Sequence, residues 1–146
     1  MASVISEVAI DTAPDDAWAA LRDFHAVHER LAPGFVVDSQ PVADDTRIVT
    51  FFNGAVAREV LVGIDDEARR LCYTVVDGPL QSTHHNASAQ VFAEPEGRSR
   101  FVWITDVLPH DRAEPVGLLM ERGLDVLKGT LEAANGRQPA ESASSE

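Results

Sequence analysis

The sequence predicts an α+β fold in which one antiparallel sheet of seven strands packs against a long C-terminal helix. Three observations lead to this prediction. A β-branched segment opens the chain, six strand-like segments fill its middle, and a single long amphipathic stretch closes it. Because turns rather than helices separate the six middle segments, neighbouring strands should be antiparallel. Such a sheet needs a cover for its apolar face, and the closing helix is the largest element available.

The first expected strand covers residues 2–10, and two short helices are expected to follow it. The first helix should begin at Pro14, because proline at the first helical position wastes no amide donor and the two acids after it favour the helix dipole. Trp18 and Leu21 then continue at roughly helical spacing. The second helix is expected over residues 24–31, where a proline–glycine pair ends it.

The middle of the chain alternates apolar and polar residues with the period of a strand. The expected strands cover residues 35–39, 47–52, 55–64, 69–76, 83–93 and 98–108. Asn53-Gly54 lies between two apolar runs and predicts a two-residue hairpin turn, since both residues accept positive φ. That turn would pair Phe52 with Ala55, and therefore Ile48 with Glu59.

The closing helix is expected over residues 114–134. Its apolar residues recur every three or four positions, at Val116, Met120, Gly123, Leu127 and Leu131. Asn135-Gly136 is a helix-ending signal. We therefore expect a single domain over residues 1–134 and a disordered tail, small and polar in composition, over residues 135–146.

Composition restricts the classes of function. The chain is 45% hydrophobic, which is enough for a core, and its net charge of −12 argues against nucleic acid and anionic membranes as partners. It has no apolar run long enough to span a bilayer, no signal-peptide pattern and one cysteine, Cys72. We expect a soluble cytoplasmic protein without a disulfide. No P-loop, dinucleotide fingerprint, G-x-S-x-G or zinc spacing occurs, so neither a cofactor nor a metal is predicted.

Two polar residues interrupt the apolar strands of the central hairpin. Glu59 is either a solvated carboxylate paired loosely with an arginine, or an inward group that accepts a ligand hydrogen bond or acts as a general base. Alternation does not decide between these alternatives. Tyr73 shares its face with Leu71 and Val75, so it should point inward, as a core residue or as a cavity donor. Cys72 should then face outward.

Adjacent histidines on the next strand face opposite ways. His85 shares the apolar face with Ala87 and Ala89, whose small side chains would leave room for a ligand, whereas His84 lies on the polar face. His85 is therefore the inward candidate, although a structural role is the alternative. His25 and His28 share one side of a short helix, but no third metal ligand is evident near them.

The orientation of the last strand stays open. Both faces of this strand are apolar, so Trp103 could be cavity wall, core or dimer surface, and Asp106 cannot be assigned to a side. Either apolar-looking outer face of the preceding strands, with Val49, Phe51, Val56 and Val60, could be a dimer surface.

Three stretches together resemble the helix-grip superfamily, also called SRPBCC or START-like, which includes START domains, polyketide cyclases, pollen allergens and plant abscisic acid receptors. They are TAPDDAWAALRDF, AREVLVGIDDEARRLCYTVVDGP and ERGLDVLKGTLE. The resemblance implies a strongly curved sheet that grips the long helix around a cavity. Members bind apolar or aromatic small molecules, and some catalyse cyclisation, dehydration or aromatisation.

In the hormone receptors of this superfamily, the glutamate resembling Glu59 points into the cavity and the position resembling Tyr73 lines it. The loop resembling residues 77–81 acts there as a mobile latch. This sequence lacks the His-Arg-Leu signature of that loop and has Val37 where the receptors place a lysine, so hormone binding is not implied.

The expected function is binding of a small hydrophobic molecule, aromatic, lipid-like or polyketide-like, between the sheet and the closing helix. The expected ligand-binding residues are Glu59, Leu61, Leu71, Tyr73, Val75, His85, Ala87, Ala89 and Met120. The alternative is a cyclase, aromatase or dehydratase in which Glu59, Tyr73 and His85 act as acid and base. A third possibility is a regulatory or assembly module, monomeric or homodimeric.

Overall fold

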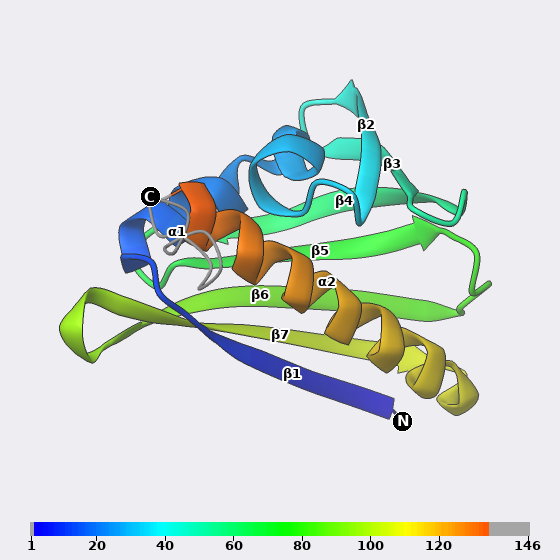
Figure 1. Cartoon of the computed structure of the whole chain (residues 1–146). Coiled ribbons are helices and arrows are strands. Elements are labelled where there is room, and N and C mark those ends of the chain that lie inside the picture. Colours follow the sequence, from blue (N-terminus) through cyan, green and yellow to red (C-terminus); the bar gives the residue numbers. More distant parts are fainter. Residues whose placement is uncertain (1, 135–146) are drawn as a thin grey trace.

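The computed structural model describes residues 2–134 and has the expected order of elements (Figure 1). The strands are β1 (Ala2–Ile10), β2 (Val36–Ala43), β3 (Thr46–Phe51), β4 (Val56–Asp65), β5 (Arg70–Asp77), β6 (His84–Glu94) and β7 (Arg98–Leu108). The helices are α1 (Pro14–Arg22) and α2 (Ala113–Ala134), with short helical turns at Phe24–Ala26, Val27–Leu31, Pro95–Gly97 and His110–Arg112. The expected helix end at Asn135-Gly136 and the tail over residues 135–146 lie outside the described residues.

The seven strands form one antiparallel sheet in the order β1-β7-β6-β5-β4-β3-β2. The sheet is curved, and α2 runs along its concave side, as Figure 1 shows. The α+β helix-grip fold predicted from the sequence is therefore confirmed. This arrangement leaves β1 and β2 as the two edges and places the core between the sheet and α2.

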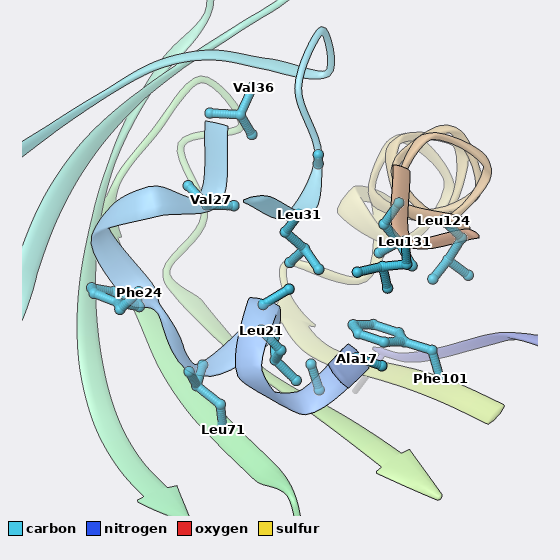
Figure 2. Close-up of a cluster of buried hydrophobic side chains, with 14 of the residues drawn as sticks. Ala17, Leu21, Phe24, Val27, Leu31, Val36, Leu71, Phe101, Leu124 and Leu131 are labelled. Carbon is cyan, nitrogen blue, oxygen red and sulfur yellow. The ribbon is translucent and has the colours of Figure 1, made fainter. Parts of the chain in front are cut away.

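The core is densest where α1 meets the sheet and the C-terminal half of α2. Ala17 and Leu21 of α1, Phe101 of β7, and Leu124 and Leu131 of α2 are all buried there (Figure 2). Removing such apolar surface from water contributes roughly 25 cal/mol per Å² to stability. This cluster therefore fixes the position of α2 over one end of the sheet.

A carboxylate in the β4–β5 turn holds α1 in place. The indole N–H of Trp18 donates to Asp66 at 2.9 Å, and Arg22 Nε donates to the same oxygen at 2.7 Å. The hydrogen bond from Arg22, and after it the one from Trp18, lowers the pKa of the Asp66 carboxyl. The acidic turn that the sequence shows between β4 and β5 is thus an anchor for the first helix.

The second short helix is irregular. Residues 24–31, expected as one helix, form a 3₁₀ turn at Phe24–Ala26 followed by a π turn at Val27–Leu31. The amide of Ala32 donates to the carbonyl of Val27, and the amide of Val36 donates back to Ala32. The chain therefore turns directly into β2, which leaves no room for a regular helix.

The turn between β3 and β4 differs from the prediction by one residue. The amide of Phe51 donates to the carbonyl of Ala55 at 2.8 Å, so the loop has three residues and only Gly54 has a positive φ, of 86°. The side chain of Asn53 accepts the amide hydrogen of Ala55, which favours this longer loop. The predicted Phe52–Ala55 and Ile48–Glu59 pairings are therefore wrong, and Arg47 is the residue that pairs with Glu59.

The suggested dimer surface is also partly wrong. Residues directly opposite in an antiparallel pair share a face of the sheet, and Val49 lies opposite the buried Ala57. Val49 and Phe51 consequently point inward, whereas Val56 is exposed and Val60 lies on the outer side with it. The four residues do not form one surface.

The last strand, which the sequence left unoriented, presents its odd-numbered residues to the interior. Phe101, Thr105 and Val107 are buried there, and Trp103 lines the interior with them. Asp106 lies on the other face, where its carboxylate accepts a hydrogen bond from Ser3 Oγ at 2.6 Å.

Strand β2 continues beyond the expected end at residue 39 and runs to Ala43. It includes Pro41, which has no amide hydrogen to donate. The strand tolerates this proline because it lies at the edge of the sheet, where one side of the backbone has no neighbouring strand.

Helix α2 buries the apolar stripe that the sequence predicts. Val116, Met120, Gly123, Leu127 and Leu131 are buried. Neither this helix nor any other within residues 2–134 is long and apolar enough to cross a bilayer.

Candidate functional site

Two adjoining cavities lie inside the curve of the sheet. An inner chamber of about 120 Å³ is walled by strands β3 to β7, the short helical turns and α2. An outer chamber of about 300 Å³ lies beneath the β5–β6 loop. The two share six wall residues, Phe51, Glu59, Val75, Leu80, His85 and Leu119. The chambers therefore form one site, in which the inner chamber is the mostly apolar end and the outer chamber is the more polar end.

A buried ion pair forms part of the wall of the inner chamber. Arg47 on β3 lies directly opposite Glu59 on β4, and its Nε and Nη2 atoms both lie 2.8 Å from Glu59 Oε1. The two side chains are 8% and 7% exposed. Arg47 Nη1 also donates to the carbonyl of Phe24 at 2.6 Å, and the guanidinium carbon lies 3.9 Å from the centre of the Phe24 ring. Arg47 thus has partners on three sides.

Glu59 lines both chambers, and only one of its carboxylate oxygens has a hydrogen-bond partner within residues 2–134. Both contacts from Arg47 go to Oε1. The other oxygen, Oε2, has no hydrogen-bond partner among residues 2–134. It is not one of the fully buried polar atoms, so part of its surface is open to the chambers that Glu59 lines. This oxygen therefore faces the cavity and is free to accept a hydrogen bond.

Tyr73 extends the polar group onto the next strand. Its side chain is buried, and its ring centre lies 5.5 Å from the guanidinium carbon of Arg47. Burial, and then the negative charge of Glu59, raises the pKa of the Tyr73 hydroxyl above its usual value of 10.0. The phenol therefore stays protonated at neutral pH and can act as a hydrogen-bond donor.

Trp103 brings another donor to the same wall. Its buried indole N–H interacts with the hydroxyl of Tyr73 and lowers the pKa of that hydroxyl, although the contact falls outside strict hydrogen-bond geometry within residues 2–134. Buried donors without a well-aligned partner are rare and costly in folded proteins. An acceptor on a bound molecule would satisfy this one.

His85 lies where the two chambers meet. Its side chain is half-buried, and burial, followed by the neighbouring His84, lowers the pKa of the imidazole. The ring is therefore neutral at neutral pH. His84 is exposed on the other face of β6, as the alternation of side chains predicts.

Helix α2 lies close to two aromatic rings at Gly123. A β-carbon at this position would lie 3.0 Å from Trp103 and 3.1 Å from Phe35, both of which line the inner chamber. The absence of a side chain is therefore what lets the helix lie against the two aromatic rings. Met120 and Leu127, one turn to either side, complete the wall that the helix provides.

The β5–β6 loop covers the outer chamber and is held in place by a hydrogen bond from an arginine. Arg112 Nε donates to the carbonyl of Leu80 at 2.6 Å, and Leu80 lines both chambers. Gln81 has a positive φ of 51°, which is unfavourable for a residue with a side chain. Ser82 Oγ is buried beside the chamber and has no hydrogen-bond partner among residues 2–134.

The structure brings most of the expected site residues together. Those that line a chamber are Glu59, Leu71, Tyr73, Val75, His85, Ala89 and Met120. Leu61 and Ala87 do not. Leu61 lies beside a bulge in the β4–β5 pairing and packs against the core instead. Ala87 is buried between its strand partners Tyr73 and Thr105, whose larger side chains cover it.

Sequence reasoning missed Arg47 and Gly123 as parts of the site. Arg47 was hidden by the one-residue error in the β3–β4 register, because the wrong pairing placed Ile48 opposite Glu59. In the correct register, an arginine and a carboxylate lie opposite each other at inward positions on adjacent strands, and this pattern would have indicated a buried ion pair. Gly123 appeared in the apolar stripe of the helix, but its contact with Trp103 depends on the fold and has no local signal.

The described residues contain no cluster of three or more histidine, cysteine, aspartate or glutamate side chains that could hold a metal ion. His25, which the sequence placed beside His28, has its Nε2 3.0 Å from the carbonyl oxygen of Asp44.

The arrangement combines apolar walls with a few inward polar groups. Glu59 Oε2 can accept a hydrogen bond or a proton, while Tyr73 and Trp103 can donate. Such a combination, with affinity from the walls and orientation from a few polar groups, is typical of small-molecule sites. The fold and the two chambers thus define a helix-grip domain with an internal cavity.

The chain belongs to the family described as polyketide cyclase / dehydrase and lipid transport, whose model matches residues 1–136. This match confirms the resemblance to polyketide cyclases drawn from the sequence. A search of curated proteins gave no match.

Solved structures with the same fold come from several bacteria. The protein XoxI from Bacillus cereus superposes with a TM-score of 0.80 at 19% identity, over 90% of this chain and 96% of its own. A protein from Thermobifida fusca superposes with a TM-score of 0.75 at 24% identity, over 95% and 99% of the two chains. A START superfamily protein from Mycobacterium smegmatis gives 0.70 at 13% identity, over 92% and 97%. At these identities the likeness establishes the fold alone.

Proposed function

We propose that the protein binds a small apolar or aromatic molecule, lipid-like or polyketide-like, in the inner and outer chambers. The observation that carries this proposal is a mostly apolar cavity whose wall holds polar groups that the fold itself does not use. The buried hydroxyl of Ser82 has no partner among residues 2–134, the buried N–H of Trp103 makes only a poorly aligned contact with the Tyr73 hydroxyl, and one oxygen of Glu59 is free. A ligand with matching groups would remove the cost of leaving them unpaired.

Native mass spectrometry of the protein from its own host tests this function. We expect an extra mass that disappears when the same sample is denatured, which gives the formula of the bound molecule. As a matched control, Leu119→Trp should fill the space that the two chambers share and abolish the extra mass, whereas Leu118→Trp on the exposed side of α2 should keep it. A protein without any extra mass, and without affinity for aromatic probes, would contradict the proposal.

Catalysis in the same cavity is the second candidate function. The observation in its favour is that Glu59, Tyr73 and His85 line the site from three neighbouring strands, β4, β5 and β6. Glu59 would remove a proton next to a ligand carbonyl, and Tyr73, whose pKa is raised mainly by burial, would donate a hydrogen bond to the carbonyl oxygen. This chemistry is that of a cyclase, aromatase or dehydratase.

The mass of the bound molecule distinguishes binding from catalysis. A ligand whose mass stays constant over hours favours a binding protein, whereas a change of mass favours an enzyme. If turnover occurs, Glu59→Gln should abolish it and still bind the molecule, because the amide keeps an acceptor oxygen but is no base. Unchanged turnover in this variant would exclude Glu59 as the base.

A further inference from the structure

The charges around the chambers restrict the chemical class of the ligand. Two carboxylates, Glu59 and Asp77, line the outer chamber, and no arginine or lysine of residues 2–134 joins them there. The imidazole of His85, which is part of the same wall, is neutral at neutral pH because burial lowers its pKa. The polar end of the site is therefore negative, within a chain whose net charge is −12.

Two arginines at the site, Arg47 and Arg112, are already engaged. Arg47 is the one arginine or lysine of residues 2–134 that lines the inner chamber. Its Nε and Nη2 atoms contact Glu59, and its Nη1 donates to the carbonyl of Phe24. Arg112 beside the loop donates to the carbonyl of Leu80 and to Asp111. To form an ion pair with Arg47, a carboxylate or phosphate on a ligand would have to displace Glu59 from Arg47 inside the protein. That exchange would leave a buried carboxylate without its partner, which is costly.

We propose that the site selects amphiphiles whose polar end is a hydrogen-bond donor, an amine or a hydroxyl, and rejects those that end in a carboxylate. The donor end meets the free oxygen of Glu59, and a protonated amine gains further from Asp77 at the rim. The apolar body occupies the inner chamber against Trp103 and the helix. This inference rests on the proposed binding function and names the class of ligand that the same site takes.

A series of four probes with one aromatic body tests the inference. The probes are 1-naphthylmethylamine, 1-naphthylmethanol, the methyl ether of this alcohol, and the carboxylate 1-naphthaleneacetate. Each is titrated calorimetrically into the whole protein at neutral pH. We expect the amine to bind about tenfold or more tighter than the carboxylate, since a hydrogen bond to a charged group is among the stronger ones. The alcohol should bind tighter than its ether, because the ether cannot donate to Glu59.

Variants that each remove one negative charge show which carboxylate causes the preference for the amine. Asp77→Asn should weaken binding of the amine by about two- to fivefold, as expected for an exposed charge, and leave the alcohol unchanged. Asp125→Asn, on the exposed side of α2 and away from both chambers, makes the same change of net charge and should affect neither probe. Glu59→Gln should reduce the preference for the amine over the carboxylate, and Asp77→Asn supplies the same test if Glu59→Gln fails to fold.

The outcomes separate this inference from the binding function. A carboxylate probe that binds as tightly as the amine and the alcohol would overturn the inference and leave binding intact. Equal weakening by Asp77→Asn and Asp125→Asn would overturn it as well, because the preference would then come from net charge alone. If none of the four probes binds, the inference fails, and the binding function fails with it only if native mass spectrometry also shows no extra mass.

Discussion

At the scale of single residues, the site is built around charges and donors held away from water. The ion pair between Arg47 and Glu59 lies under apolar side chains, with Tyr73 on the next strand. Taking two charges out of water is costly, and a buried pair therefore contributes less to stability than its short distances suggest. Its main effect here is to fix the position of the free Glu59 oxygen in the cavity wall.

The Arg47–Glu59 pair can be tested with one single and one double variant. Arg47→Met should lower the free energy of unfolding by about 3–5 kcal/mol, because it leaves the Glu59 carboxylate buried without its partner. The double variant Arg47→Met/Glu59→Met should recover most of this loss, since no charge is left behind. Urea unfolding of the three proteins measures both values. A cost below about 1 kcal/mol for the single variant would mean that water screens the pair.

Tyr73 allows a direct spectroscopic test, because it is the single tyrosine of the chain. Burial, and after it Glu59, raises the pKa of the hydroxyl from its usual value of 10.0, so the folded protein keeps a proton that the unfolded chain releases. The stability that this provides is complete below about pH 10 and is lost as the pH rises further. In an alkaline titration, we expect the phenolate absorbance of the folded protein to appear well above the pH at which it appears in denaturant.

The Tyr73→Phe variant is the control for this titration and should show no phenolate absorbance. A folded wild-type protein that titrates near pH 10 would contradict the buried position of the hydroxyl.

At the scale of elements, the contact between α2 and the sheet determines the size of the inner chamber. The helix lies against Trp103 and Phe35 because Gly123 has no side chain, while Gly129, on the exposed side of the same helix, has open space around it. The same substitution at the two positions should therefore have opposite effects.

Gly129→Ala should raise the free energy of unfolding by about 0.5–1 kcal/mol, because alanine is a better helix former than glycine. Gly123→Ala gains the same helix propensity but forces a methyl group against the two rings. We expect a net loss of about 1–2 kcal/mol, as in other overpacked cores. Urea unfolding of both variants measures the difference. Equal stabilisation by the two would show that the helix does not rest closely on Trp103.

Local signals in the sequence predict the elements but not their exact partners. Pro14 followed by two acids marks the start of α1, and the spacing of Val116, Met120 and Leu127 marks the buried side of α2. The β3–β4 register was wrong because the side chain of Asn53 favours a three-residue loop, and a shift of one residue changes every partner along both strands. Arg47 was consequently not recognised as the partner of Glu59.

At the scale of the whole molecule, the strong negative charge acts against the compact state. The net charge is −12 at pH 7, and like charges on a folded surface repel one another. The ion pairs found on the surface of the described residues are exposed and each contributes little. Self-repulsion should therefore outweigh the attraction of these pairs.

Raising the ionic strength from about 0.01 to 0.15 M should consequently raise the melting temperature, since it shortens the screening length from about 30 to 8 Å. Each 1 kcal/mol gained at the midpoint corresponds to roughly 2–4 °C for a chain of this size. Calorimetric scans in sodium chloride and in choline chloride measure the shift. Equal shifts in both salts identify screening, whereas a falling melting temperature would show that the surface ion pairs dominate.

Global features were also the easiest to predict, because they depend on sums over many residues. The order of strands and helices follows from composition and period over long windows, and the structure confirms it. The orientation of Trp103 and Asp106 could not be predicted, because both faces of β7 carry apolar residues and the side that faces α2 is decided by the whole sheet. The chambers depend in the same way on contacts between distant parts of the chain.

The pairing of the first strand with the last one has a consequence for synthesis on the ribosome. β1 pairs only with β7, with Ala2 opposite Val107, while strands β2 to β7 each pair with their neighbours in the chain. β1 is made before its partner and must therefore wait until the rest of the sheet has been translated. Until then its backbone groups lack a partner, and the nascent meander has neither that edge strand nor the helix that fills its concave side. We expect the newly made chain to depend on a chaperone until Leu108 and the helix after it have left the exit tunnel.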